Sequence, residues 1–279
     1  MCGRYASSAS PEDLVDEFDI DQDRLDEATR SVLVNPQQPP AGEPDYNMAP
    51  TKQAPVVLTR APRGEPDAEP TRQLRLLTWG LVPAWAKDTK VGVRMINARS
   101  EELLESRTYA KPALVRRCIV PADGWYEWQV SPTATDAKGK PRKQPFFIRR
   151  ADGDRIAFAG LYEFWKDRSK DADDPLAWVA SYSIITQAAE TGLDRIHDRQ
   201  PLVLDRDLWQ TWLDPAVTDP GAVEEMLQPS ETGRFEAWPV SRAVSSNRNN
   251  GATLIEPVGR DELVGVVDPM TGEVIGGGE

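Results

Sequence analysis

The chain has 279 residues, of which 39% are hydrophobic and 28% charged, and it contains nine Trp. This composition is typical of a globular protein that buries a sizeable core, and it excludes a disordered chain. No apolar run approaches the ~18 residues that cross a bilayer, and the first residues lack the basic and apolar segments of a secretory signal. We therefore expect a cytoplasmic protein without a membrane partner.

Cysteine and histidine are scarce. The two cysteines, Cys2 and Cys118, cannot form a disulfide framework or a four-thiolate zinc site, and His197 alone excludes a histidine-rich metal site. We expect neither a metal nor a cofactor. Cys118 lies in the apolar run 116–121 and is interpreted as a core residue.

The net charge of −12 is unevenly distributed along the chain. Residues 1–50 carry 3 basic and 11 acidic side chains, whereas residues 86–120 carry 8 basic and 4 acidic ones. Phosphate contacts dominate affinity for nucleic acids, so a local positive groove on an acidic protein is one interpretation. On charge alone, scattered solvated side chains are the favoured interpretation.

A helix is predicted over residues 11–29, because Ser10-Pro11 is a helix-start signal and Leu14, Val15 and Phe18 share one face. Further helices are predicted at 101–105 after an N-cap at Ser100, at 205–213 and at 220–227. Seven runs are predicted to be strands, at 54–60, 74–79, 116–121, 145–149, 155–161, 177–185 and 201–204.

The predicted strands are short and do not alternate with helices, which favours an α+β protein with antiparallel sheets over a parallel βαβ fold. Loops are expected at 35–45, 61–73, 131–143 and 166–175, the last two as hairpin tips. No repeat or composition shift divides the chain. We expect one domain over 1–258 and a flexible C-terminal tail over 259–279 that ends in GGGE.

Cys2 is the most distinctive residue for chemistry, because a small second residue normally permits removal of Met1. The mature chain would then carry an α-amine and a thiol on one residue. The α-amine titrates near ~7.7–8.0, so about a tenth of it is an uncharged nucleophile at neutral pH. Such a group suits either capture of an aldehyde, as an imine that closes to a thiazolidine, or amide hydrolysis by an N-terminal nucleophile. The simpler alternative is an ordinary residue near a terminus.

Polar residues embedded in apolar or aromatic segments are the other candidates. Asn97 lies in RMINARSEE, Glu127 in DGWYEWQ and His197 in RIHDRQP. Each also has a structural interpretation, as a helix cap, an exposed strand residue and a structural histidine respectively. Beside Cys2, Gly3 permits close backbone approach and Arg4 offers donors for a phosphate.

Eleven motifs in order then show a resemblance. They are MCGRY (1–5), YNMAPT (46–51), WGLVPAWAKD (79–88), INARSE (96–101), KPA (111–113), RRCIVPADGWYEW (116–128), FAGLYEFW (158–165), SIIT (183–186), IHDRQP (196–201), WPVS (238–241) and LIEP (254–257). The chain resembles the SRAP family, the SOS-response-associated peptidase-like proteins that sense abasic sites in single-stranded DNA. The resemblance implies a mainly antiparallel, barrel-like β core with a few peripheral helices.

The resemblance also implies an enzyme that processes abasic sites in a DNA damage response. Cys2, freed by autoproteolytic loss of Met1, would cross-link to the C1′ aldehyde of an abasic site, with Asn97, Glu127 and His197 completing the active site. Residue chemistry suggests roles for these three. A desolvated Glu127 would shuttle protons, His197 would exchange a proton at the sugar oxygen, and Asn97 would hold the amine or an alkoxide.

The implied partner is single-stranded DNA that contains abasic sites, bound by a monomer. The expected DNA contacts are Arg4, Asn47, Pro50, Trp85, Arg99 and Thr186. Trp85 would stack on a base or wedge against a duplex end, and a buried core tryptophan is the alternative. One departure from the family pattern is Gln200, where Met is common.

Two other classes of function stay open. An N-terminal-Cys autopeptidase or hydrolase acting on peptides would share Cys2 but would not need Arg4 and Arg99. A non-covalent single-strand-binding module would not need a processed terminus.

Overall fold

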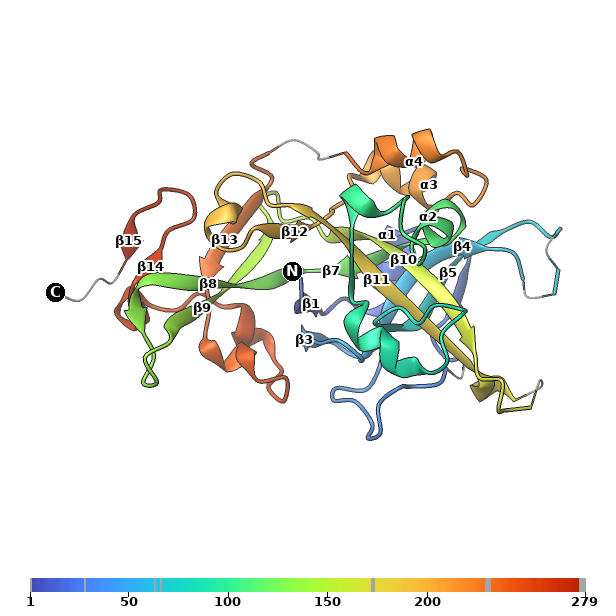
Figure 1. Cartoon of the computed structure of the whole chain (residues 1–279), viewed down its shortest axis with the longest axis horizontal. Helices are drawn as coiled ribbons and strands as arrows, with labels where there is room; N and C mark the ends of the chain where they lie inside the picture. Colours follow the sequence, from blue (N-terminus) through green and yellow to red (C-terminus); the bar gives the residue numbers. More distant parts are fainter. Residues whose placement is uncertain are drawn as a thin grey trace.

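Two β-sheets frame the protein, and the N-terminal end of the chain lies between them (Figure 1). The computed structural model describes residues 2–27, 29–62, 64–65, 67–171, 174–228 and 232–275. The first sheet is closed into a barrel. The second is open and lies on the side from which the C-terminus leaves (Figure 1).

The barrel consists of β4 (Gln53–Arg60), β5 (Thr71–Trp79), β7 (Arg117–Ala122), β10 (Ile156–Lys166) and β11 (Trp178–Ala188). Neighbours in the order β5-β4-β7-β10-β11 pair antiparallel, and β11 returns to β5 in a parallel pairing that closes the ring. Three short strands extend this sheet, namely β2 (Gln22–Arg24), β6 (Asn97–Arg99) and β12 (Arg199–Pro201).

Alternate barrel residues point inward and fill the interior. Tyr5, Trp79 and Tyr182 form a layer across it, with Trp79 stacked on Tyr182 and a hydrogen bond of 2.6 Å between the Tyr5 and Tyr182 hydroxyls. Cys118 is fully buried here, which confirms its interpretation as core. Gly160 faces it, and a Cβ at Gly160 would lie 2.9 Å from the Cys118 Sγ.

The second sheet is antiparallel throughout, in the order β13-β9-β8-β1-β3. Its strands are β13 (Phe235–Pro239), β9 (Pro141–Arg150), β8 (Gly124–Thr135), β1 (Tyr5–Ser7) and β3 (Asp45–Met48). Strand β1 pairs with β8 on one side and β3 on the other. This pairing positions Cys2, just before β1, against the barrel core.

The helices are short and peripheral. They are α1 (Pro11–Glu17), α2 (Ala110–Val115), α3 (Trp209–Leu213) and α4 (Pro220–Met226). Their apolar residues pack on the outward-facing side chains of the barrel strands. The predicted α+β class with an antiparallel, barrel-like core is thus confirmed. No helix in the described part of the chain is long and apolar enough to cross a membrane.

Single 3-10 turns connect these elements. They are η1 (Thr89–Arg94), η2 (Ser100–Glu102), η3 (Pro175–Ala177), η4 (Leu193–Arg195), η5 (Arg206–Leu208), η6 (Arg242–Ser245), η7 (Ala252–Ile255) and η8 (Arg260–Glu262).

The helix predicted over 11–29 is wrong beyond its first two turns. Ser10 does cap α1, since its hydroxyl accepts from the Asp13 N–H at 3.1 Å. The helix ends at Glu17, with Phe18 as its C-cap. The Phe18 ring stacks on Trp209 at 4.5 Å, and Asp19 takes a left-handed conformation with φ of 50°. Residues 22–24 are then drawn into β2 by pairing with β5, so tertiary pairing overrides helix propensity.

Two other predicted helices are also shorter than expected. The segment 101–105 is only the turn η2, and Arg99 rather than Ser100 precedes it, without a side-chain cap. The segment 205–213 is divided into η5 and α3. The strand predicted at 201–204 is β12, which ends at Pro201, followed by an isolated bridge between Val203 and Phe158.

The loop expected at 131–143 and the tail expected from 259 are both more ordered than the sequence predicts. Strands β8 and β9 take up most of the loop expected at 131–143. Within the expected tail from 259, Leu263 and Val266 are buried, and β14 (Val266–Val267) pairs with β15 (Val274–Ile275). Gln129 exchanges hydrogen bonds of 2.9 and 2.7 Å with the Val267 backbone, so packing continues past 258. Residues 276–279, and 172–173 of the loop expected at 166–175, lie outside the described residues.

Candidate active site

Cys2 lies against the barrel just before β1 and is fully buried. The Asn97 Nδ2 donates a hydrogen bond of 2.8 Å to the Cys2 carbonyl, which fixes the backbone of the residue expected to react. Asn97 is itself held by the pairing of β6 with β11, where it lies opposite Ile184. The Tyr109 hydroxyl donates to the Asn97 carbonyl at 3.3 Å.

The Glu127 carboxyl belongs to the middle of β8, opposite Phe146 of β9, and is buried. Burial, with a smaller contribution from the negative charge of Asp198, raises the pKa of Glu127 to about 8. Burial also raises the pKa of the Cys2 thiol, and the charge of Glu127 adds to that effect. At neutral pH both groups are therefore predominantly protonated and neutral.

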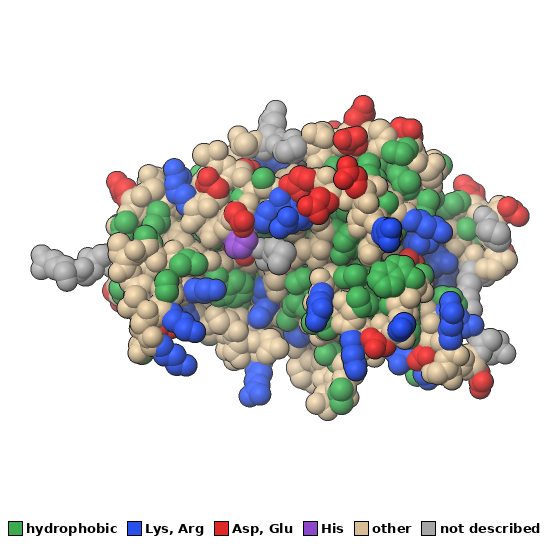
Figure 2. Space-filling model, in the orientation of Figure 1, with side chains coloured by type: hydrophobic (Ala, Val, Ile, Leu, Met, Phe, Trp, Pro, Cys, Tyr) green, Lys and Arg blue, Asp and Glu red, His purple; other side chains and the backbone are tan. Residues whose placement is uncertain are grey.

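His197 follows the turn η4 and is the one histidine of the chain, visible at the surface in Figure 2 (purple). Its Nδ1 lies 3.0 Å from the Arg199 N–H and 2.8 Å from the Asp198 carboxylate. Burial lowers the pKa of His197, and Asp198 opposes that shift. In the neutral ring Nδ1 accepts from Arg199 and the proton sits on Nε2; in the charged ring Nδ1 donates to Asp198.

Two expected DNA contacts, Arg4 and Asn47, bind each other. The Arg4 Nη1 donates to the Asn47 Oδ1 at 2.6 Å and to the Val244 carbonyl at 3.0 Å, and its guanidinium lies 6.0 Å from the Trp128 ring. Asn47 is fully buried, and its Nδ2 donates to the Ser246 and Asn249 carbonyls at 2.9 and 2.8 Å, and to that of Val244 at 3.3 Å. The structure thus gives Asn47 the position of a support for Arg4.

Arg99 and Thr186 lie opposite each other in the pairing of β6 with β11. Arg99 is 61% exposed, with Glu102 at 3.7 Å, so its guanidinium is accessible to an anion. Thr186 is buried, and its carbonyl accepts from the Arg199 Nη2 at 2.6 Å. Pro50 is partly exposed at the end of β3.

Trp85 was predicted either to stack on DNA or to be a buried core residue. Its side chain is 65% exposed, so the interpretation as a core tryptophan is wrong. An exposed aromatic face is what stacking on a base requires. On the face seen in Figure 2, acidic side chains gather along the upper edge and most Lys and Arg side chains are spread below it.

Sequence reasoning missed several supporting residues. Asp198 and Arg199 lie within the IHDRQP segment, and their position next to His197 in this motif could have indicated them. Arg199 also forms an ion pair with Glu101 at 2.5 Å. Tyr109 carries no sequence signal for its contact with Asn97. Gln200 is buried, and its Oε1 accepts from the Glu190 N–H at 2.9 Å, so it supports the backbone before η4. Among the described residues, no group of three or more His, Cys, Asp or Glu side chains forms a metal-binding cluster.

The fold and site define a class of α+β barrel proteins that hold a cysteine near the N-terminus, close to a buried carboxylic acid. Residues 1–247 match the family described as SOS response associated peptidase (SRAP). The chain belongs to this family.

Individual relatives agree with this assignment. The abasic site processing protein YoqW of Bacillus subtilis (strain 168) is 37% identical over 258 residues, which cover 92% of this chain and 99% of YoqW. The abasic site processing protein YedK of Escherichia coli (strain K12) is 33% identical, covering 92% and 100% of the two chains. A crystal structure of a protein from Bacteroides thetaiotaomicron shows the same fold, with a TM-score of 0.71 and 21% identity over 92% of this chain and 100% of that one.

Proposed function

We propose that this protein processes abasic sites in single-stranded DNA by forming a covalent link through Cys2. The observation that carries the proposal is the fixed backbone of Cys2 beside the carboxyl of Glu127, whose burial raises its pKa to about 8. The names of YoqW and YedK, which describe those proteins as abasic site processing proteins, support the same substrate.

The first step is attack of the Cys2 α-amine on the C1′ aldehyde of the ring-opened sugar, after loss of Met1. The carbinolamine that forms loses water when an acid protonates its hydroxyl, which leaves an imine. Glu127 suits this role, because it is still protonated at neutral pH. Its charge also acts on Cys2, since it raises the pKa of the Cys2 thiol. The Asn97 Oδ1 is buried and accepts no hydrogen bond from any described residue, so it is available to the amine.

The second step is addition of the Cys2 sulfur to the imine carbon. The thiol proton passes to the ring nitrogen, directly or through the Glu127 carboxylate formed in the first step, and a five-membered thiazolidine results. His197, with its proton on Nε2 in the neutral ring, would exchange a proton with the sugar O4′ during ring opening or reversal. The atoms balance with release of one water molecule.

DNA contacts would come from the remaining predicted residues. Arg99 and Arg4 would bind phosphates, Trp85 would stack, and Pro50 and Thr186 would lie near the lesion. Asn47 would act through Arg4, whose guanidinium it holds at 2.6 Å. Phosphate contacts carry no sequence information, so binding would be independent of sequence.

The test uses a labelled oligonucleotide with one abasic site, separated on a denaturing gel after incubation with the protein. A heat-stable shifted band is expected for the parent and for Cys118→Ala, a matched control at the other cysteine, and no band is expected for Cys2→Ala. Intact mass should show loss of one methionine. A band that survives in Cys2→Ala would contradict the proposal, as would peptide hydrolysis without a cross-link, which is the result expected of an N-terminal-Cys hydrolase.

A further inference from the structure

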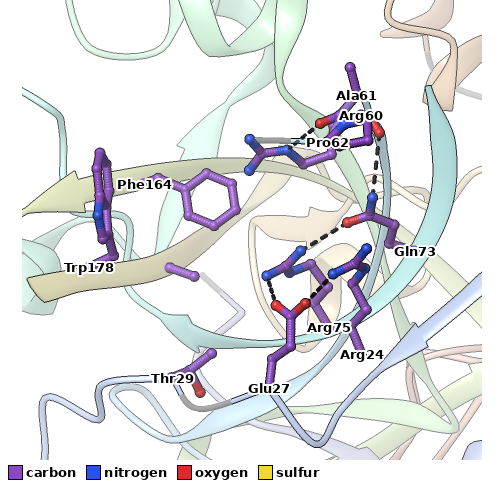
Figure 3. Close-up of a pocket in the computed structure, with 11 residues that line it drawn as sticks. Arg24, Glu27, Thr29, Arg60, Ala61, Pro62, Gln73, Arg75, Phe164 and Trp178 are labelled. Carbon is purple, nitrogen blue, oxygen red and sulfur yellow. Dashed lines mark hydrogen bonds and ion pairs between the residues drawn. The ribbon is translucent and has the colours of Figure 1, made fainter. Parts of the chain in front are cut away.

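The barrel is open at the end away from Cys2. A cavity of about 490 Å³ occupies this end and is lined by residues of β2, β4, β5, β10 and β11 (Figure 3). Such a volume is in the range of small-molecule sites, and the mouths of β-barrels are frequent places for them. We refer to this cavity as the barrel mouth.

The barrel mouth is separated from Cys2 by the packed interior. Trp178 and Ala180 line the cavity, Tyr182 belongs to the aromatic layer in the interior, and Ile184 pairs with Asn97 at the Cys2 end. At ~3.3 Å per residue, four residues from Ala180 to Ile184 place the two sites on the order of 13 Å apart along β11. A ligand in the mouth therefore does not reach the cysteine.

Arginine gives the barrel mouth its charge. Arg24, Arg60 and Arg75 line it, and Glu27 is the one acidic residue among the described residues of the lining. Glu27 is paired with both Arg24 and Arg75 (Figure 3), whereas Arg60 makes no ion pair with any residue in the described ranges. The described side chains of the lining thus carry an excess of two positive charges on a protein whose net charge is −12.

These arginines are held in place before any ligand arrives. The Gln73 Oε1 accepts from the Arg75 Nη1 at 2.9 Å, and the Arg60 Nε donates to the Ala61 carbonyl at 3.3 Å. Burial lowers the pKa of Arg75, and the positive charges of Arg60 and Arg24 lower it too, an effect that a bound anion would relieve. Fixed guanidinium groups lose little entropy when they bind a phosphate.

Aromatic rings form the other wall. The Phe164 ring lies between Trp178 and the arginine side chains in Figure 3. The guanidinium of Arg60 lies 4.5 Å from the centroid of the Phe164 ring, and the Lys166 Nζ lies 5.7 Å from that of Trp178. Flat rings and guanidinium planes are the surfaces on which nucleobases stack.

We propose that the barrel mouth binds a mononucleotide, with its base against the Phe164 and Trp178 wall and its phosphate on Arg60 and Arg75. A phosphate monoester carries about −1.5 to −2 charges at pH 7, which matches the excess of two positive charges in the lining. A phosphodiester unit of a DNA strand carries only one. The ligand is therefore a free nucleotide, and the site is independent of the chemistry at Cys2.

The probe is deoxyadenosine monophosphate, titrated into the full chain by calorimetry. Binding is expected in the parent and in Cys2→Ala alike. The result therefore does not depend on whether Cys2 forms the proposed cross-link. Deoxyadenosine and inorganic phosphate should each bind at least tenfold more weakly. Arg60→Gln and Phe164→Leu should each weaken binding about tenfold or more.

Arg149→Gln is the matched control, since Arg149 also lies over an aromatic ring, 5.0 Å from that of Trp238, but outside the mouth. It should leave binding unchanged. Unfolding temperatures verify that each variant is folded, and shifts of Trp indole signals in the parent report the site without any substitution.

Three outcomes would overturn the proposal. They are no binding by the parent, equal weakening by Arg149→Gln, and tighter binding of a short thymidine oligonucleotide than of thymidine monophosphate at a site sensitive to Arg60→Gln. The last result would assign the mouth to a DNA strand.

Discussion

The two ends of the barrel are built from the same strands but differ in charge. At the Cys2 end, burial keeps a thiol and the carboxyl of Glu127 neutral, and the pKa of that carboxyl is raised to about 8. At the mouth, three arginines are partly balanced by one carboxylate, and the excess charge is open to a ligand. One end is suited to exchange protons, and the other to hold an anion.

The difference has a structural cause in strand position. Inward-facing residues in the middle of the strands, such as Leu58 and Leu77, are apolar and fill the interior. Two residues further toward the mouth, the same face carries Arg60 and Arg75. The interior thus separates the proposed site of proton transfer from the positively charged mouth, and changes at either end should be separable.

Glu127→Gln should produce the largest effect. The amide cannot donate the acidic proton, and general acid catalysis contributes about 10²–10⁴-fold, so cross-linking should slow by about 100-fold or more. The parent rate should fall as pH rises above 8, because the acid form of Glu127 is lost there, and the variant should lack that fall. Single-turnover cross-linking rates from pH 6 to 9.5 measure both effects, and equal rates for parent and variant would remove Glu127 from the reaction.

The same substitution should change stability in a pH-dependent way. The folded state raises the pKa of Glu127 from 4.5 to about 8, so it binds the proton more tightly than the unfolded chain does. The parent therefore loses stability as pH rises from about 4.5 to 8, by about 1.4 kcal/mol for each unit of pKa difference at most. Glu127→Gln should be more stable than the parent at pH 9 by a few kcal/mol.

Urea unfolding at pH 5 and pH 9 verifies this effect. A difference in unfolding free energy between variant and parent that is the same at both pH values would show that Glu127 titrates normally in the folded protein. The proton-donor role would then lose its physical basis.

Asn97→Ala should have an intermediate effect. It removes the hydrogen bond of 2.8 Å to the Cys2 carbonyl and leaves that carbonyl without this donor. Misplacement of a nucleophile is costly, so cross-linking should slow by roughly tenfold. DNA affinity, measured with Cys2→Ala in the background, should stay within twofold of the control. A loss of affinity that accounts for the whole loss of rate would make Asn97 a binding residue only.

The sequence predicts the barrel better than the second sheet. Runs such as 54–60 and 177–185 are apolar and β-branched, and the structure has strands there. Strands β1 and β3 are only three and four residues long and exist because they pair with distant segments, for which a local pattern has no signal. Glu127 belongs to a strand that pattern alone did not assign, because its segment is aromatic on both faces.

Site geometry is predictable only in part. Chemistry singled out Cys2, and their apolar surroundings made Asn97, Glu127 and His197 candidates, to which the family resemblance gave an active-site role. No spacing rule reveals that residues 2 and 97 share a hydrogen bond. Burial of Asn47 was equally hidden. The arginines of the mouth have no signal in the sequence, since only the strand register directs them inward.

Arg99→Ala should have the smallest effect on DNA binding. It also distinguishes the Cys2 end of the barrel from the mouth. Arg99 is exposed and its only ion pair among the described residues is with Glu102 at 3.7 Å, so its loss should not disturb the fold. Loss of one phosphate contact should weaken binding of abasic-site DNA a few-fold and lower the slope of log affinity against log salt by about 1. Arg60→Gln removes the same charge at the mouth and should leave both the affinity and the slope unchanged. If Arg60→Gln lowers the slope as much as Arg99→Ala, the DNA strand extends to the mouth and the two ends are one binding surface.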